Sequence, residues 1–245
     1  MIKLDVAVLS ERGGRTENQD ACDQWSGEGT AFFVVCDGAG GHLGGAVASK
    51  LALAETLASL RATGACTAEA LELAMRTAND ALVREQQAQT QFSQMRATIV
   101  ALAIDLMRGS ASWGHLGDSR LYCFRNRNIV AQTRDHSVVQ TLVDAGYLQP
   151  RELRTSPERS KLLSALGDAD HFEPAVAAET FPLATGDKFL LCTDGLWEYV
   201  QESEMEAAIA ECASAQDWLR ALERYVLARG KRKHDNYSAI AVWVL

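Results

Sequence analysis

One pattern occurs twice in the chain, as Phe32-Phe33-Val34-Val35-Cys36-Asp37-Gly38 and as Phe189-Leu190-Leu191-Cys192-Thr193-Asp194-Gly195. Each copy is a short apolar run that ends in Asp-Gly. A continuous apolar run of this length predicts a strand that is buried on both faces. The glycine allows a sharp turn, which can present a backbone carbonyl beside the carboxylate. A single Asp-Gly pair is usually a plain turn. Two carboxylates that face one cleft, however, repel each other unless a cation lies between them.

The rest of the chain alternates between short strands and amphipathic helices. We expect strands over residues 4–9, 31–36, 98–105, 110–116, 120–125, 128–132, 188–192 and 237–245. We expect helices over residues 44–60, 67–87, 137–145, 202–213 and 217–228, the second of them capped by Thr67. Short turns at Gly109, Gly117 and Asn126 predict an antiparallel meander between residues 98 and 132. Buried strands with paired helices indicate layers of sheet covered by helices.

The composition indicates an ordinary globular protein. With 245 residues, 47% of them hydrophobic and 23% charged, the chain is expected to form one domain, residues 1–245, and is not mostly disordered. The net charge of −8 argues against a nucleic-acid-binding surface. The apolar runs are too short to span a bilayer, and the N-terminus lacks the apolar core of a signal peptide. The six cysteines include no Cys-x-x-Cys, so we expect reduced thiols in a cytoplasmic protein.

Further acidic residues lie near the expected strand ends. Asp20 follows the first strand, Asp118 lies at the expected hairpin turn after Gly117, and Asp235 precedes the last strand. A site rich in carboxylate oxygens, without cysteine or paired histidine ligands, suits Mg²⁺ or Mn²⁺ better than zinc. The residues alone therefore predict a metal–carboxylate site.

Six motifs occur in a characteristic order along nearly the whole chain, from about residue 5 to 244. They are Arg15-Thr16-Glu17-Asn18-Gln19-Asp20, Asp37-Gly38-Ala39-Gly40-Gly41-His42, Gly117-Asp118-Ser119-Arg120, Asp135-His136-Ser137, Asp194-Gly195-Leu196-Trp197 and Asp235-Asn236. Each motif alone is weak, but the ordered set strongly resembles the metal-dependent protein phosphatases (the PPM family, type 2C), in their compact bacterial form.

This resemblance implies an α+β fold, a four-layer sandwich of two antiparallel β-sheets flanked by pairs of α-helices. It also implies a binuclear Mn²⁺ or Mg²⁺ centre. Asp37 matches the carboxylate that bridges both metals, and the carbonyl of Gly38 matches a ligand of the second. Asp194 and Asp235 match the ligands of the first metal. Asp20 matches a residue in or near the second shell of ligands.

Other matches concern a third metal and the substrate. Asp118 matches the acid that holds a third, weaker metal in bacterial relatives, and Arg15 matches the phosphate-binding arginine. His42 has two open interpretations, a catalytic proton donor or a structural histidine in a glycine-rich turn. Where many relatives have Met-Gly-Thr-Thr, this chain has Met95-Arg96-Ala97-Thr98.

The resemblance implies a protein serine/threonine phosphatase, in which a metal-bridging hydroxide attacks the phosphorus. The expected partners are phosphorylated Ser/Thr proteins, including a cognate kinase or its substrates. Nucleic acids and membranes are not expected as partners, and the chain is expected to be a monomer. The alternative is a catalytically weak, phosphoprotein-binding pseudophosphatase. A cysteine phosphatase is excluded because no cysteine is followed by Arg six positions later.

Overall fold

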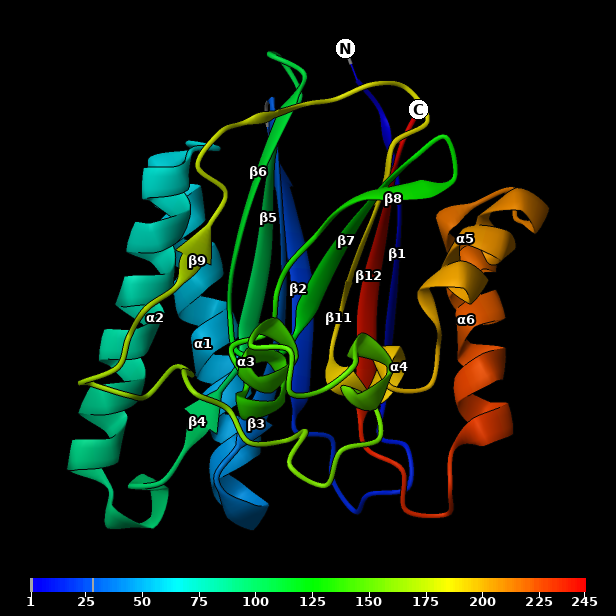
Figure 1. Ribbon diagram of the computed structural model, residues 1–245. Helices are drawn as coiled ribbons and strands as arrows, with labels where there is room; N and C mark the ends of the chain where they lie inside the picture. The colour runs from blue at the N-terminus through cyan, green and yellow to red at the C-terminus, as the bar shows by residue number, and fades with distance from the viewer. Residues whose placement is uncertain (1, 28) are drawn as a thin grey trace.

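Two antiparallel β-sheets lie against each other in the computed structural model, which describes residues 2–27 and 29–245 except for the side chains of 41–43 (Figure 1). The first sheet is ordered β1 (Leu4–Glu11), β12 (Tyr237–Val244), β11 (Lys188–Cys192), β7 (Arg120–Arg125) and β8 (Asn128–Gln132). The second is ordered β10 (Phe181–Pro182), β6 (Ser110–Leu116), β5 (Ile99–Asp105), β3 (Thr30–Ala39) and β2 (Asp20–Gly27). Two short strands extend it, β4 (Arg96–Ala97) beside β3 and β9 (Ala175–Val176) beside β6.

Helices cover the outer face of each sheet. The helices α1 (Gly41–Thr63) and α2 (Ala68–Ala88) pack on the second sheet, and Thr67 caps α2 as expected. The helices α5 (Glu202–Glu211) and α6 (Ala215–Arg229) cover the first sheet. Shorter helices lie near one end of the sheets, namely α3 (Val138–Asp144) and α4 (Asp194–Trp197) (Figure 1). The predicted four-layer α+β sandwich is therefore confirmed.

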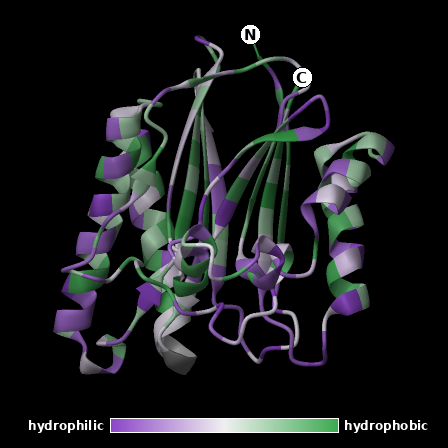
Figure 2. Cartoon of the chain, viewed as in Figure 1, coloured by the Kyte–Doolittle hydropathy of each residue, from purple (hydrophilic) through white to green (hydrophobic). Residues whose placement is uncertain are grey.

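Three hydrophobic clusters separate the four layers, and they explain the continuous apolar runs in the sequence. In β3, Phe32 and Val34 pack toward α1 and α2, whereas Phe33 and Val35 pack toward the first sheet. The whole of β12 is buried in the same two-sided way. Each of these two strands lies between two apolar layers, so both are hydrophobic on both faces. Figure 2 shows the hydrophobic colour concentrated on the strands.

The predicted meander is wrong at one connection. The strands β5 and β6 pair with each other and β7 pairs with β8, but β6 and β7 belong to different sheets. Residues 117–119 therefore form a crossover between sheets, and Asp118 is not in a hairpin turn. Gly117 has a φ of 98°, which a tight connection of either kind can use, so the sequence signal is the same for both.

Some elements of the structure were not predicted from the sequence. The strand β2 was not expected, because its sequence is largely polar, and neither was the short helix α4. All six cysteines are free, and four of them are buried. Among the described residues, no helix combines the length and apolarity needed to cross a membrane.

Candidate metal centre

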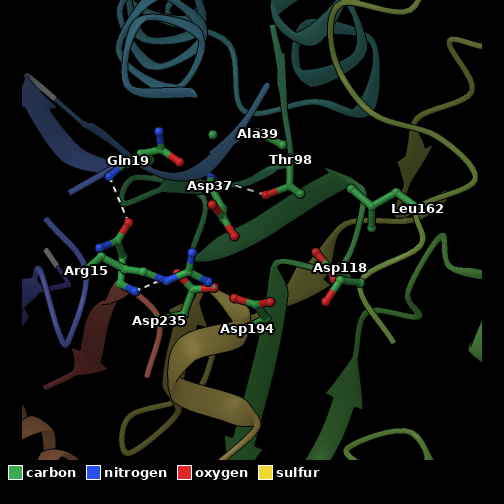
Figure 3. A pocket seen from close by; sticks show the side chains of 12 residues that line it. Arg15, Gln19, Asp37, Ala39, Thr98, Asp118, Leu162, Asp194 and Asp235 are labelled. Carbon is green, nitrogen blue, oxygen red and sulfur yellow. Dashed lines mark hydrogen bonds and ion pairs between the residues drawn. The ribbon is translucent and has the colours of Figure 1, made fainter. Parts of the chain in front are cut away.

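Carboxylates from both sheets line one cleft of about 240 Å³. Asp37 is near the end of β3 in the second sheet, and Asp118 lies in the crossover between the two sheets. Asp194 follows β11 and Asp235 precedes β12, both in the first sheet. Figure 3 shows these four carboxylates turned toward a common space, with Arg15 beside Asp235. The predicted acidic residues are thus brought together from distant parts of the sequence.

The two Asp-Gly pairs need their glycines for close backbone contacts. A Cβ atom on Gly38 would lie 2.0 Å from the carbonyl oxygen of Gly45 in α1. A Cβ atom on Gly195 would lie 1.8 Å from the carbonyl oxygen of Asn236. Neither glycine has the positive φ that a glycine-specific turn would require. The sequence pattern therefore identified the right positions, but the structural reason is close packing between elements.

Backbone and hydroxyl contacts fix the position of Asp37. The amide of Asp37 donates to Thr98 Oγ1 at 3.2 Å, and the amide of Thr98 donates to the Asp37 carbonyl at 2.8 Å. Thr98 Oγ1 also shares a hydrogen bond of 2.7 Å with Ser119 Oγ. Burial, followed by repulsion from Asp20 and Asp194, raises the pKa of Asp37 well above its ordinary value. The site thus fixes the backbone of Asp37 and places its carboxyl where the negative charge is disfavoured.

Asp20 lies directly opposite Asp37 on the neighbouring strand β2. Its Oδ2 accepts a hydrogen bond of 2.9 Å from Thr193 Oγ1, and burial is the main reason that its pKa is raised to about 6. Asp194 also has a strongly raised pKa, first because of burial and then because of Asp118. Asp20 Oδ1 and Asp194 Oδ1 are buried without a hydrogen-bond partner in the described part of the chain. Such atoms are acceptors suited to a cation.

Arg15 reaches the cleft and forms an ion pair with Asp235, with Nη2 and Oδ2 2.5 Å apart. The side chains are 54% and 40% exposed, so solvent screens this pair. Asn236 anchors the loop that carries Arg15, because its Nδ2 donates to the carbonyls of Arg12 at 2.7 Å and Glu17 at 2.9 Å. The arginine is therefore placed at the mouth of the cleft, where it can contact an anionic substrate.

Asp118 is more enclosed than a turn residue would be. Asp118 is only 5% exposed. Burial, followed by repulsion from the nearby Asp135, raises the pKa of its carboxyl to about 7. The indole Nε1 of Trp197 donates to the Asp118 carbonyl at 2.9 Å. The guanidinium of Arg120 lies 3.5 Å from the Trp197 ring centre and forms a buried bidentate pair with Asp135. A rigid, buried network thus supports Asp118.

The first turn of α1 contains His42, but its side chain lies outside the described residues. The two interpretations of His42 therefore stay predictions. Sequence reasoning missed Ser160 and Leu162, which also line the cleft. Both come from an irregular segment with no periodicity, so no signal in the sequence could have placed them there.

The donor set fits hard divalent cations. Four clustered carboxylates, the neighbouring Asp20 and the backbone at Gly38 offer oxygen ligands only, as Mg²⁺ and Mn²⁺ prefer. Asp20 Oδ1 and Asp194 Oδ1 are the two buried oxygens among them that lack a hydrogen-bond partner in the described part of the chain. Among the described residues, however, no three His, Cys, Asp or Glu side chains converge closely enough to surround an ion. The carboxylates line a shared space but stand apart, as expected for like charges.

Comparisons with known proteins agree with this geometry. The family model described as Protein phosphatase 2C matches residues 10–234, which is most of the chain. The chain therefore belongs to the protein phosphatase 2C family, the bacterial PPM phosphatases that its motifs resemble. The match ends one residue before Asp235, so the assignment of that residue rests on its place in the cleft.

Two relatives and one solved structure illustrate the similarity. The serine/threonine protein phosphatase PstP of Mycobacterium tuberculosis is 32% identical over 246 residues, which cover 99% of this chain but 45% of PstP. The chain thus spans about half the length of that relative. Protein phosphatase PhpP of Streptococcus pneumoniae is 28% identical over 232 residues, 91% of each chain. The catalytic domain of PstP, solved in complex with two manganese ions, superposes with a TM-score of 0.85 at 29% identity and full coverage of both chains (100%).

Proposed function

We propose that this chain is a metal-dependent protein phosphatase that hydrolyses phosphoserine and phosphothreonine in proteins. The observation that carries the proposal is the convergence of strand-end carboxylates from both sheets around one cleft, with Arg15 at its mouth. The family membership and the names of its relatives support the same activity.

The proposed metal ligands divide between the two sheets. Asp37 would bridge two ions, the Gly38 carbonyl would bind the second, and Asp194 and Asp235 would hold the first. Asp20 would lie in or near the second shell of metal ligands, where its hydrogen bond from Thr193 Oγ1 holds it in place. Asp118 would hold a third, weaker ion.

When bound, two Mn²⁺ or Mg²⁺ ions lower the pKa of a coordinated water, and their positive charge stabilises the phosphoryl group. The carboxylates of this chain balance that positive charge and fix where it lies. Arg15 can bind two phosphate oxygens through its planar guanidinium, which orients the phosphorus in the cleft. No cysteine or serine nucleophile is required, so no phosphoenzyme is expected.

The test is hydrolysis of p-nitrophenyl phosphate and of a phosphothreonine peptide. Activity should be lost after exhaustive chelation with EDTA and return with Mn²⁺ or Mg²⁺. Asp37→Asn and Asp194→Asn should be inactive, while the surface variant Asp23→Asn on β2 serves as the control. Undiminished activity in fully chelated protein would contradict the proposal.

The pseudophosphatase alternative lacks support, because the acids whose loss would signal it, Asp20, Asp37, Asp118, Asp194 and Asp235, are all present. We further propose a cytoplasmic, monomeric enzyme whose catalytic domain comprises residues 1–245. Its substrates would be phosphoproteins made by a Ser/Thr kinase, including the kinase itself. Phosphoproteomic comparison of a deletion strain with its parent would identify them.

A further inference from the structure

A second cavity adjoins the catalytic cleft. It measures about 250 Å³ and shares Ala39, Ser160 and Leu162 with the cleft as common walls. Arg96 and Asp168 supply its charged side chains. An extended peptide advances about 3.5 Å per residue, so a side chain one or two residues from a phosphoresidue in the cleft can enter this neighbouring space.

The backbone of Arg96 is tied directly to the catalytic strand. Arg96 pairs with Ala39, and Ala97 pairs with Gly38, in the short antiparallel pairing of β4 with β3. Because of this pairing, Arg96 and Ala97 lie beside the strand that carries Asp37. The fold therefore fixes the distance between the backbone of Arg96 and the catalytic cleft.

The guanidinium of Arg96 is also held in place. Its Nη1 donates a short hydrogen bond to the carbonyl of Gly167, which also accepts one of 2.8 Å from Gln86 Nε2. The amide of Gly167 donates to Asn79 Oδ1 at 2.8 Å. Gln86 and Asn79 both belong to α2, so a helix of the outer layer supports the loop that orients this arginine.

Most donors of Arg96 stay available to a ligand. A guanidinium has five N–H donors, and the one hydrogen bond found among the described residues is that to Gly167. Its ion pair with Asp168 is loose, at 4.0 Å, and the arginine side chain is 36% exposed. Asp168 is held elsewhere, because its Oδ1 accepts from the amides of Asp170 and His171 at 3.1 Å each. The arginine thus faces the cavity as an oriented, partly unpaired cation.

We propose that Arg96 forms a specificity subsite for an anionic side chain, a carboxylate or a second phosphate, that lies close to the phosphoresidue of the protein substrate. This proposal rests on the proposed phosphatase function and adds a substrate preference to it. Ser160 and Ser164 line the same cavity. Ser160 can donate a hydroxyl hydrogen bond to the anion, whereas the Ser164 hydroxyl already donates to the carbonyl of His171 at 2.6 Å. Asp168 opposes the binding of an acid, so the two charged residues of the subsite act in opposite directions.

The experiment compares kcat/KM for a set of phosphothreonine peptides with Mn²⁺ present. Alanine, lysine, glutamate or phosphoserine is placed in turn at each of the two positions on either side of the phosphothreonine. We expect an acidic residue at one position to raise kcat/KM about fivefold over alanine, as for a partly exposed charge pair. Lysine there should lower it, and the acidic preference should shrink at high salt. Equal gains from glutamate and phosphoserine indicate a general anion subsite, and a gain from phosphoserine alone indicates a phosphate subsite.

Variants of the two charged residues give opposite expectations. Arg96→Gln should reduce the acid-to-alanine ratio to below about twofold, and Arg96→Lys should keep part of it. Asp168→Asn should increase the ratio, because its oxygen still accepts the two amides while the repulsion is removed. Arg108→Gln is the matched control, since Arg108 is 83% exposed at the turn after β5, at the far end from the cleft.

A substrate-binding role of Arg96 and a purely structural one lead to different results. If wild-type protein shows no acidic preference at any position, or Arg96→Gln retains it, the subsite is refuted. An equal loss on all peptides in Arg96→Gln would show a purely structural role and also refute it. If no peptide is hydrolysed at all under metal-replete conditions, the phosphatase function itself fails.

Discussion

Asp20 and Asp37 occupy directly opposed positions in the antiparallel pair formed by β2 and β3. Asp20 is buried and Asp37 is half-buried. Like charges at opposed positions destabilise a sheet. Burial is the main reason that the pKa of both carboxyls is raised. Repulsion from Asp20 raises the pKa of Asp37 further, and repulsion from Asp235 adds to the rise at Asp20. The fold therefore brings two acidic side chains together in one sheet, at the point where a bound cation would relieve their repulsion.

The first prediction concerns Asp20→Asn in chelated protein. The folded pKa of Asp20 is about 6, above its ordinary 3.8, so the protonated carboxyl stabilises the fold below pH 3.8 and this stability is lost as the pH rises through 6. Asparagine has no carboxyl to ionise, so the variant does not lose this stability as the pH rises. At pH 7 the variant should be more stable to unfolding by up to about 3 kcal/mol, and the gain should vanish near pH 4.

Urea unfolding of both proteins at the two pH values measures this difference. Asp23→Asn, an exposed position on the same strand, is the control and should show no gain. Equal stability of Asp20→Asn and wild type at pH 7 would show that the buried Asp20 carboxylate does not destabilise the chelated protein.

The second prediction concerns Arg15→Ala. A guanidinium that contacts phosphate in both ground and transition states contributes mostly uniform binding, so KM should rise clearly and kcat should fall less. Loss of a charge-assisted bidentate contact should lower kcat/KM roughly 10–200-fold. Arg15→Lys should recover only part of it.

The Arg15–Asp235 ion pair adds a second measurement on the same variant. Removing Arg15 frees the Asp235 carboxylate, but the pair is half exposed, so Mn²⁺ affinity should rise by less than about fivefold. Titration calorimetry with Mn²⁺ measures it. If Arg15→Ala has the KM and kcat of the wild type, Arg15 forms only a surface ion pair and does not bind the phosphate.

The third prediction concerns Asp235→Asn, which preserves shape and removes one charge. We expect kcat to fall at least about 10²-fold, comparable to the loss of one major electrostatic contributor. The bound metal, measured by elemental analysis after gel filtration, should also decrease. If turnover and metal content both match wild type, Asp235 is not a ligand.

The fourth prediction concerns Asp118→Ala. The hydrogen bond from Trp197 goes to the backbone carbonyl of Asp118, so the variant should keep its local fold. We expect turnover to drop while the two tightly bound metals remain, as for a residue that holds only a third ion. Loss of the tight metals in calorimetry would instead make Asp118 a ligand of the main pair.

The sequence predicted most strands and helices because their apolar periodicity is strong, and it predicted that acids would gather at strand ends. It could not assign β6 and β7 to separate sheets, because the turn residues at Gly117 suit a hairpin and a crossover equally. The ion pair of Arg15 with Asp235 joins residues 220 positions apart, so only the fold reveals it. The same holds for the contact between Arg96 and Gly167.

The order of strands in the first sheet has a consequence for biosynthesis. The strand β12 lies between β1 and β11, with Leu4 paired to Val244 at one end of the register. During translation, β1 therefore emerges early and has no partner until residues 237–244 leave the ribosome. The nascent chain must keep this apolar edge from aggregating in the meantime. The helices α1 and α2 can already pack on β2, β3 and β5 by then, so the second sheet is expected to serve as the template on which the first is assembled.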